Sequence, residues 1–261
     1  FHELLASIED HQEKFLLGMD GIKDTIKNKA KVFEVEKVVP RMYRNDPTLW
    51  TDTPEEKEVI QTRLGWLNLP YESEALIAEL TQFADSCKAD GIEQVLLLGM
   101  GGSSLAPETM QMVFRDAISG MSLKILDSTV PGQVKEAESW VDYKRTLFIV
   151  ASKSGTTSET ISMFQYFWAK SKPILGDKQA DHFIAITDPG SKLAELGKTS
   201  GFRAVFTANP NVGGRYSVLS HFGLVPAALM GINLKNFLNR AQNTQDMCSK
   251  PGEINLNAGA L

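Results

Sequence analysis

The sequence has few cysteines, few histidines and no long apolar run. Cys87 and Cys248 are its only cysteines, and neither a CxxC pair nor a histidine at metal-ligand spacing accompanies them. A disulfide framework is therefore excluded, and we expect a reducing compartment, the cytoplasm, with no metal and no cofactor. The longest apolar stretches, such as Val95–Met100 and Phe222–Met230, are far shorter than the ~20 residues that cross a bilayer, so we expect no membrane segment.

An excess of positive charge is also absent. The 27 lysines and arginines against 32 aspartates and glutamates give a net charge of -5, which argues against nucleic-acid and membrane partners. An anionic ligand would need a local site. The 43% hydrophobic and 23% charged residues are typical of a soluble globular protein and exclude a disordered chain. The start, Phe1-His2-Glu3, has neither an initiator Met nor a secretory signal, so we expect an excised piece of a longer protein.

The pattern along the chain predicts three regions. Residues 1–69 are polar and helical or extended, with prolines and aromatics near the end, and we expect a helical N-terminal arm. Residues 70–208 alternate short apolar runs with amphipathic segments, which predicts an α/β domain of three layers (αβα) around a five-stranded parallel sheet. Residues 209–261 form the remaining region.

Short apolar runs bounded by turn residues predict the strands, which are Val95–Met100, Leu123–Asp127, Leu147–Ser152, His182–Thr187 and Ala204–Thr207. The predicted helices between and beside them are Glu72–Ala89, Pro107–Ile118, Gly132–Trp140, Thr157–Lys170 and Lys192–Thr199. In such sheets, ligands bind at the carboxyl ends of the strands.

The loop Gly99–Ser104 follows the first predicted strand and precedes a helical pattern. Its glycines would let backbone N–H groups approach an anion, and Ser103 and Ser104 add hydroxyl donors. The loop also nearly fits a dinucleotide fingerprint, with Ser104 in place of the third glycine and Asp127 at the end of the second strand. A tight turn that only packs helix against strand is the third interpretation.

The segment Ser152–Thr160 follows an apolar strand with a dense group of hydroxyls and one lysine. A phosphate monoester presents acceptor oxygens that match hydroxyl donors and helix N-terminal amides, while Lys153 adds charge. Thr156 and Glu159 fit a capping box, so we interpret Glu159 as a helix cap rather than a catalytic base. Neither this segment nor the first loop has the GK[ST] triplet of a Walker phosphate loop, so ATP hydrolysis is not indicated.

The third loop, Asn211–Ser217, places two glycines before Arg215. Such a backbone can bend sharply and present a guanidinium, with its permanent charge and paired donors, to a developing oxyanion. A solvated arginine beside a turn fits the spacing equally well.

Together, GMGGSSL, SKSGTTSET and GGRYSVLS resemble the motifs of the phosphoglucose isomerase family in the sugar-isomerase (SIS) superfamily, in its order and spacing. The resemblance covers about residues 40–233. It implies a flavodoxin-like SIS fold, and the lead-in Arg41–Leu67 resembles the version of the enzyme fused behind transaldolase.

The resemblance also implies an activity, the interconversion of glucose 6-phosphate and fructose 6-phosphate through an enediolate, and a homodimer of the full-length protein. Arg215 would stabilise the enediolate, and Gly102 would lie against the sugar. The residues implied for phosphate binding are Ser103, Ser152, Lys153, Ser154, Thr156 and Thr157.

The sequence departs from the family in two ways. His221 stands where the family more often has a small residue, and its apolar surroundings favour a packing role. The later ESNGK-type motif with the proton-transfer glutamate is not in the sequence, so we expect the phosphate-binding half of the enzyme and the start of an incomplete second domain over 209–261. A non-enzymatic sugar-phosphate sensor and a dinucleotide-binding oxidoreductase are the alternatives.

Overall fold

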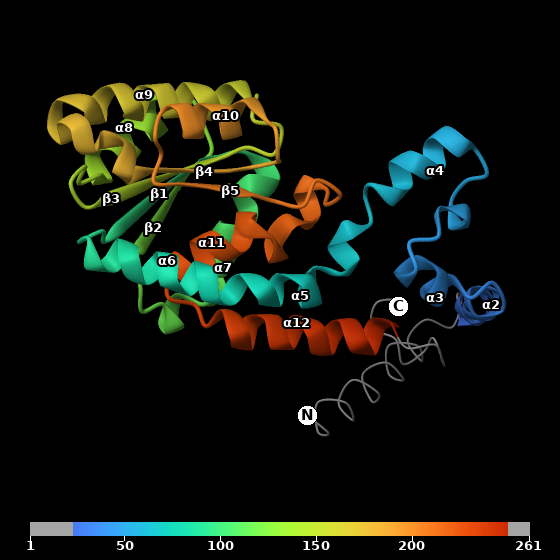
Figure 1. The fold of residues 1–261 in the computed structure, drawn as a ribbon. Coiled ribbons are helices and arrows are strands. Elements are labelled where there is room, and N and C mark those ends of the chain that lie inside the picture. The colour runs from blue at the N-terminus through green and yellow to red at the C-terminus, as the bar shows by residue number, and fades with distance from the viewer. Residues whose placement is uncertain (1–22, 250–261) are drawn as a thin grey trace. The chain divides into compact units, whose positions relative to one another are not determined.

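The computed structural model describes residues 23–249, and residues 1–22 and 250–261 lie outside the described part (Figure 1). The chain divides into two compact units. The sheet unit comprises Thr62–Ala241, and the terminal unit comprises the chain before and after it. Within the described residues, no helix is both long and apolar enough to span a bilayer.

A parallel five-stranded sheet of order β2-β1-β3-β4-β5 forms the centre of the sheet unit, which confirms the predicted fold class. Its strands are β1 (Gln94–Gly99), β2 (Ser122–Leu126), β3 (Thr146–Ala151), β4 (Phe183–Thr187) and β5 (Ala204–Thr207). The chain runs outward from β1 to β2 and then from β3 toward β5, so the strand order reverses between β1 and β3. Gly99 and Ala151 pair at the carboxyl end of this switch point, where sheets of this topology bind ligands.

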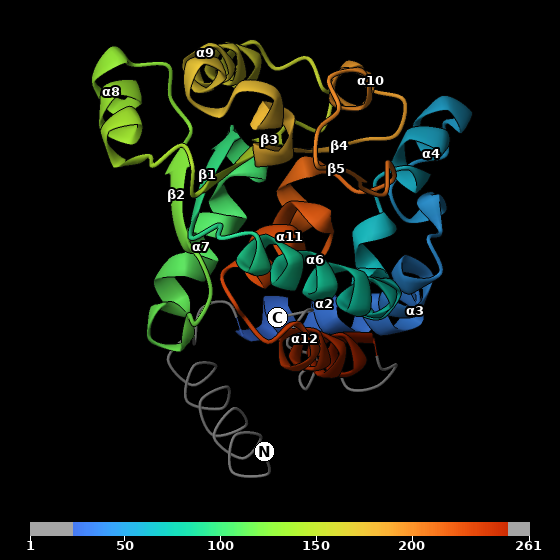
Figure 2. The same cartoon turned by 60° about the vertical axis from the view of Figure 1, so that its left-hand side comes forward.

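Helices cover both faces of the sheet, so the predicted three layers are confirmed (Figures 1 and 2). Val95 and Leu97 of β1 pack toward one face, and Leu96 and Leu98 toward the other, because successive side chains of a strand alternate. Burial on both faces explains why the central strands are continuous apolar runs. One face carries α6 (Ile77–Ala89), α7 (Leu105–Val113) and α11 (His221–Leu229), and the other carries α8 (Pro131–Trp140), α9 (Ser158–Leu175) and α10 (Lys192–Thr199).

Several helix boundaries differ from the predicted ones. The segment predicted as one helix over Glu72–Ala89 begins as α5 (Leu69–Glu72) and the 3-10 turn η3 (Ser73–Leu76) before α6 starts. The predicted helix Pro107–Ile118 begins earlier and ends at Val113, followed by the 3-10 turn η5 (Arg115–Ala117). In α11, every residue from Phe222 to Leu229 is buried, and such a helix lacks the polar face by which periodicity identifies helices.

The described part of the terminal unit is helical up to residue 61, as the predicted N-terminal extension requires. It contains α2 (Lys23–Val35), α3 (Val38–Tyr43), the 3-10 turn η1 (Pro47–Leu49) and α4 (Pro54–Gln61). Arg41 joins α3 to η1 through a 2.7 Å ion pair with Asp46. Hydrogen bonds from Thr48 and Arg41 lower the pKa of Asp46 to about 2. The last helix, α12 (Leu234–Ser249), begins in the sheet unit.

Candidate functional site

A pocket of about 420 Å³ lies beside the carboxyl ends of β1, β3 and β4. Five residues predicted for the site line it: Gly102, Ser103, Lys153, Ser154 and Thr157. The other lining residues are Arg63, Met100, Asp188, Pro210 and Gly214. The two loops expected to share one ligand therefore border a single pocket.

The loop after β1 turns into the 3-10 segment η4 (Gly101–Ser103). Gly101 has a φ of 54°, a conformation that favours glycine. A Cβ on Gly102 would stand 2.3 Å from the carbonyl oxygen of Gly214, so only glycine allows this approach of the two loops. Ser104 is fully buried and its Oγ donates to the Gly101 carbonyl at 3.1 Å, which leaves Ser103 as the serine that lines the pocket.

The loop after β3 uses some of its hydroxyls to hold its own shape. Ser152 is 2% exposed, and its Oγ shares a 2.9 Å hydrogen bond with Oγ1 of Thr157. Thr156 donates from its hydroxyl to Oγ of Ser154 at 3.1 Å and does not line the pocket. Ser154 and Thr157 face the pocket, and Ser152 and Thr156 support them.

The predicted capping box of Thr156 and Glu159 is wrong. The cap of α9 is Thr157, and it makes no side-chain capping bond because its hydroxyl pairs with Ser152. Glu159 interacts instead with its own backbone N–H and with Ser158, and both lower the pKa of its carboxyl. The cap at Thr157 therefore leaves first-turn N–H groups of α9 other than that of Glu159 without a side-chain partner, and such groups bind anions.

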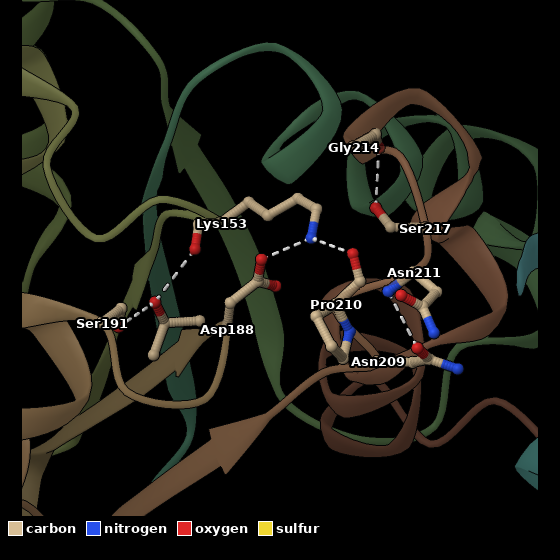
Figure 3. A network of polar contacts seen from close by, with 9 residues as sticks. Lys153, Asp188, Ser191, Asn209, Pro210, Asn211, Gly214 and Ser217 are labelled. Carbon is tan, nitrogen blue, oxygen red and sulfur yellow. Dashed lines mark hydrogen bonds and ion pairs between the residues drawn. The ribbon is translucent and has the colours of Figure 1, made fainter. Parts of the chain in front are cut away.

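Lys153 is held by residues that follow β4 and β5 (Figure 3). Its Nζ forms an ion pair with Asp188 and donates to the Pro210 carbonyl at 3.3 Å. Its backbone carbonyl accepts from the amide of Asp188 at 3.1 Å and from Thr187 Oγ1 at 3.4 Å, and Thr187 shares a 2.7 Å hydrogen bond with Ser191. Sequence reasoning missed Asp188, although an acid directly after a strand of a parallel sheet is a signal that could have identified it.

The loop with Arg215 approaches the site through its backbone. It forms the 3-10 segment η7 (Gly214–Leu219), closed by a 2.7 Å bond from Ser217 Oγ to the Gly214 carbonyl (Figure 3). The backbone nitrogen of Arg215 lies 3.2 Å from the position of a Cβ on Gly102. The Arg215 side chain is exposed, and it does not line the pocket.

His221 lies at the start of α11, with its ring stacked on Phe206 at a centroid distance of 5.6 Å. Burial lowers its pKa, an effect that Glu79 and the backbone of Thr207 partly offset. This environment fits the packing role expected for it. Among residues 23–249, no group of three potential ligand side chains could hold a metal ion.

The fold and the loops at its switch point define the class: a three-layer α/β domain with a hydroxyl-lined ligand pocket at the carboxyl ends of its parallel strands. A sequence model described as phosphoglucose isomerase matches residues 76–257, and the chain belongs to this family.

The curated relatives are longer than this chain. A glucose-6-phosphate isomerase of Thermus thermophilus is 32% identical over 194 residues, which cover 74% of this chain and 45% of the relative. One of Carboxydothermus hydrogenoformans is 31% identical over 206 residues, which cover 75% and 44%. The chain thus spans less than half the length of these relatives.

Two solved structures share the fold. A crystal structure of a Thermus thermophilus protein has a TM-score of 0.73 and 27% identity, covering 89% of this chain and 52% of its own. A glucose-6-phosphate isomerase from Chlamydia trachomatis has a TM-score of 0.68 and 19% identity, covering 90% and 47%.

Proposed function

We propose that this chain binds the phosphate group of a hexose phosphate and serves in the interconversion of glucose 6-phosphate and fructose 6-phosphate. The observation that carries the proposal is the single pocket between the hydroxyl-bearing loops after β1 and β3, at the uncapped start of α9. A phosphate dianion needs several donors at one point, and this pocket combines serine and threonine hydroxyls with helix N-terminal amides. Family membership and the names of the curated relatives support the sugar as the remainder of the ligand.

The proposed binding roles follow the geometry of the pocket. Ser103, Ser154 and Thr157 donate hydrogen bonds to the phosphate oxygens, and the backbone at Gly102 lies against the sugar. Ser152, Lys153 and Thr156 complete the phosphate site, with Ser152 and Thr156 acting through the hydroxyls that they position.

Arg215 is proposed to stabilise the enediolate. In this isomerisation a proton moves between C1 and C2, and negative charge develops on the sugar oxygens in the transition state. Gly102 and the backbone of Arg215 are close, so the loop that carries Arg215 lies beside the position proposed for the sugar. A group that stabilises only developing charge raises turnover more than affinity.

Thermal unfolding in the presence of ligands tests the proposal. We expect fructose 6-phosphate to raise the Tm of the chain, because a ligand that binds only the folded state stabilises it. Fructose without the phosphate is the matched control and should give no shift. A rise with NAD and none with sugar phosphates would overturn the proposal in favour of a dinucleotide-binding protein.

We also propose that the phosphosugar-binding domain, predicted over 70–208, extends to the end of the sheet unit at Ala241, and that the full-length protein is a cytoplasmic homodimer. Within the described residues, neither Cys87 nor Cys248 forms a disulfide, which supports a reducing compartment. Light scattering of the full-length protein tests the dimer.

A further inference from the structure

Lys153 lines the pocket, but its positive charge is not available to offset the negative charge of a bound phosphate. Three charged side chains line it: Arg63, Lys153 and Asp188. Lys153 and Asp188 form an ion pair, and each side chain is 22% exposed. Their charges cancel, whereas a phosphate monoester carries about -1.5 to -2 at neutral pH. Any net positive charge of the pocket lining therefore comes from a side chain other than Lys153.

Arg63 is the remaining cation of the pocket lining. Within residues 23–249, its guanidinium has no hydrogen-bond or ion-pair partner. An arginine offers a planar fork of donors that matches two phosphate oxygens at once. The guanidinium is thus available to a ligand, and its donors match phosphate oxygens.

The segment after Arg63 is fixed to the loop that carries Arg215. Leu64 forms a β-bridge with Val212, and the amide of Gly65 donates to the Asn211 carbonyl at 3.1 Å. A Cβ on Gly65 would stand 2.8 Å from that same carbonyl oxygen, so the approach requires glycine.

One residue further on, Trp66 stacks on Tyr216 with 5.2 Å between ring centroids and 20° between planes. The backbone beside Arg63 is consequently held against the loop that also contacts Gly102. Because the backbone beside Arg63 is already fixed, ligand binding has to order only the Arg63 side chain.

We propose that Arg63 binds the phosphate group of the sugar phosphate and supplies the net positive charge that the paired Lys153 does not. The proposal rests on the proposed function and adds a binding residue from outside the three loops that the family motifs mark. Arg63 belongs to the segment that precedes the sheet, and it lines the same pocket as the loops after β1 and β3.

Calorimetric titration of the full chain with inorganic phosphate and with fructose 6-phosphate tests this inference. We expect Arg63→Gln to lower the affinity for both ligands by ~10- to 100-fold, which is the effect typical of losing a hydrogen bond to a charged group. Arg63→Lys should recover part of the affinity, because it keeps the charge and loses the fork. The matched control is Arg115→Gln, at a 78% exposed side chain that does not line the pocket, and it should leave both affinities unchanged.

The salt dependence gives a second readout. Wild-type binding should weaken as salt rises, and Arg63→Gln should show a smaller salt slope, since one charge no longer takes part. Should Arg63→Gln fail to fold, the affinity of Arg63→Lys still decides the question, because this variant keeps the charge and loses only the paired donors. Equal affinities and equal slopes for wild type and both Arg63 variants would overturn the role of Arg63 and leave the proposed function standing. If the wild-type chain bound neither inorganic phosphate nor fructose 6-phosphate, the proposed function itself would be overturned, and this inference with it.

Discussion

At the scale of single residues, the hydroxyl groups of the site divide into two kinds. Ser104 and Ser152 are buried and use their hydroxyls to hold the loops. Ser103, Ser154 and Thr157 line the pocket. The same residue type therefore serves structure in one position and the ligand in the next.

This division predicts different effects for two alanine substitutions, one at a residue that lines the pocket and one at a residue that holds a loop. Thr157→Ala should weaken binding of fructose 6-phosphate by ~1 to 2 kcal/mol, because a hydrogen bond to a charged group is lost. Ser104→Ala should leave binding nearly unchanged and lower the free energy of unfolding by ~1 kcal/mol through its lost internal bond. Calorimetry and urea unfolding of both variants measure the two effects, and equal binding losses would contradict the division.

The ion pair between Lys153 and Asp188 predicts that removing the carboxylate raises the affinity for phosphate. Asp188→Asn removes a negative charge from the pocket and releases the ammonium of Lys153. We expect tighter binding of inorganic phosphate and a free energy of unfolding lower by about 1 kcal/mol, the upper range for an ion pair that is partly exposed. Titration and urea unfolding test both, with Asp116→Asn, at a 95% exposed surface carboxylate, as control. Weaker phosphate binding would show that Asp188 aids the ligand rather than opposing it.

His221 predicts a loss of stability in mild acid. Its pKa lies below the ordinary value of 6.5 in the folded protein because burial disfavours the charged ring. The folded state therefore binds this proton less readily than the unfolded chain, and stability present above pH 6.5 falls as the pH drops through the folded pKa. Thermal unfolding between pH 7 and 5 should show a smaller loss of stability for His221→Phe than for wild type, and equal losses in the two proteins would contradict this role of His221.

At the scale of elements, the site depends on close packing between η4 and η7. The two segments are far apart in the sequence, one after β1 and the other after β5, and glycine at 102 permits the contact with Gly214. The chain after β5 thereby becomes part of the same pocket as the chain after β1.

This contact predicts that Gly102→Ala is disruptive. The added Cβ meets backbone that cannot rotate away, so we expect a loss of ~1 to 3 kcal/mol in the free energy of unfolding and weaker sugar-phosphate binding. Gly214→Ala, whose Cβ would meet nothing within 4 Å, is the matched control and should change stability by less than ~0.5 kcal/mol. Similar losses for both variants would mean that chain flexibility, not the contact, limits the substitution.

At the scale of the whole molecule, Cys87 reports on the opening of the core. It is fully buried on α6, and burial raises the pKa of its thiol to about 11. A buried neutral thiol is unreactive, so alkylation requires the core to open.

We expect fructose 6-phosphate at ~100 times its Kd to slow alkylation of Cys87 by roughly 100-fold, since the ligand stabilises the closed state. Alkylation of Cys248, which is half-buried, provides a reference in the same sample. Mass spectrometry measures both rates. An unchanged rate at Cys87 would mean that the thiol is reached without loss of the binding pocket.

The strands were the most predictable elements. Each predicted strand overlaps an observed one to within a residue at either end, because short apolar runs between turn residues are a local signal. The start of α6 and the whole of α11 were less predictable. The region before α6 breaks into short turns, and α11 is apolar on all sides, so neither shows a helical period.

The sequence by itself determined the parallel sheet, the polar loops at the ends of its strands and the family motifs, because periodicity and turn chemistry act within a few neighbouring residues. Only the tertiary structure decided which hydroxyls line the pocket, that Asp188 neutralises Lys153 and that Arg63 reaches the site. Those contacts join residues far apart in the chain, and they depend on strand order and on how closely two loops pack, which no local pattern encodes.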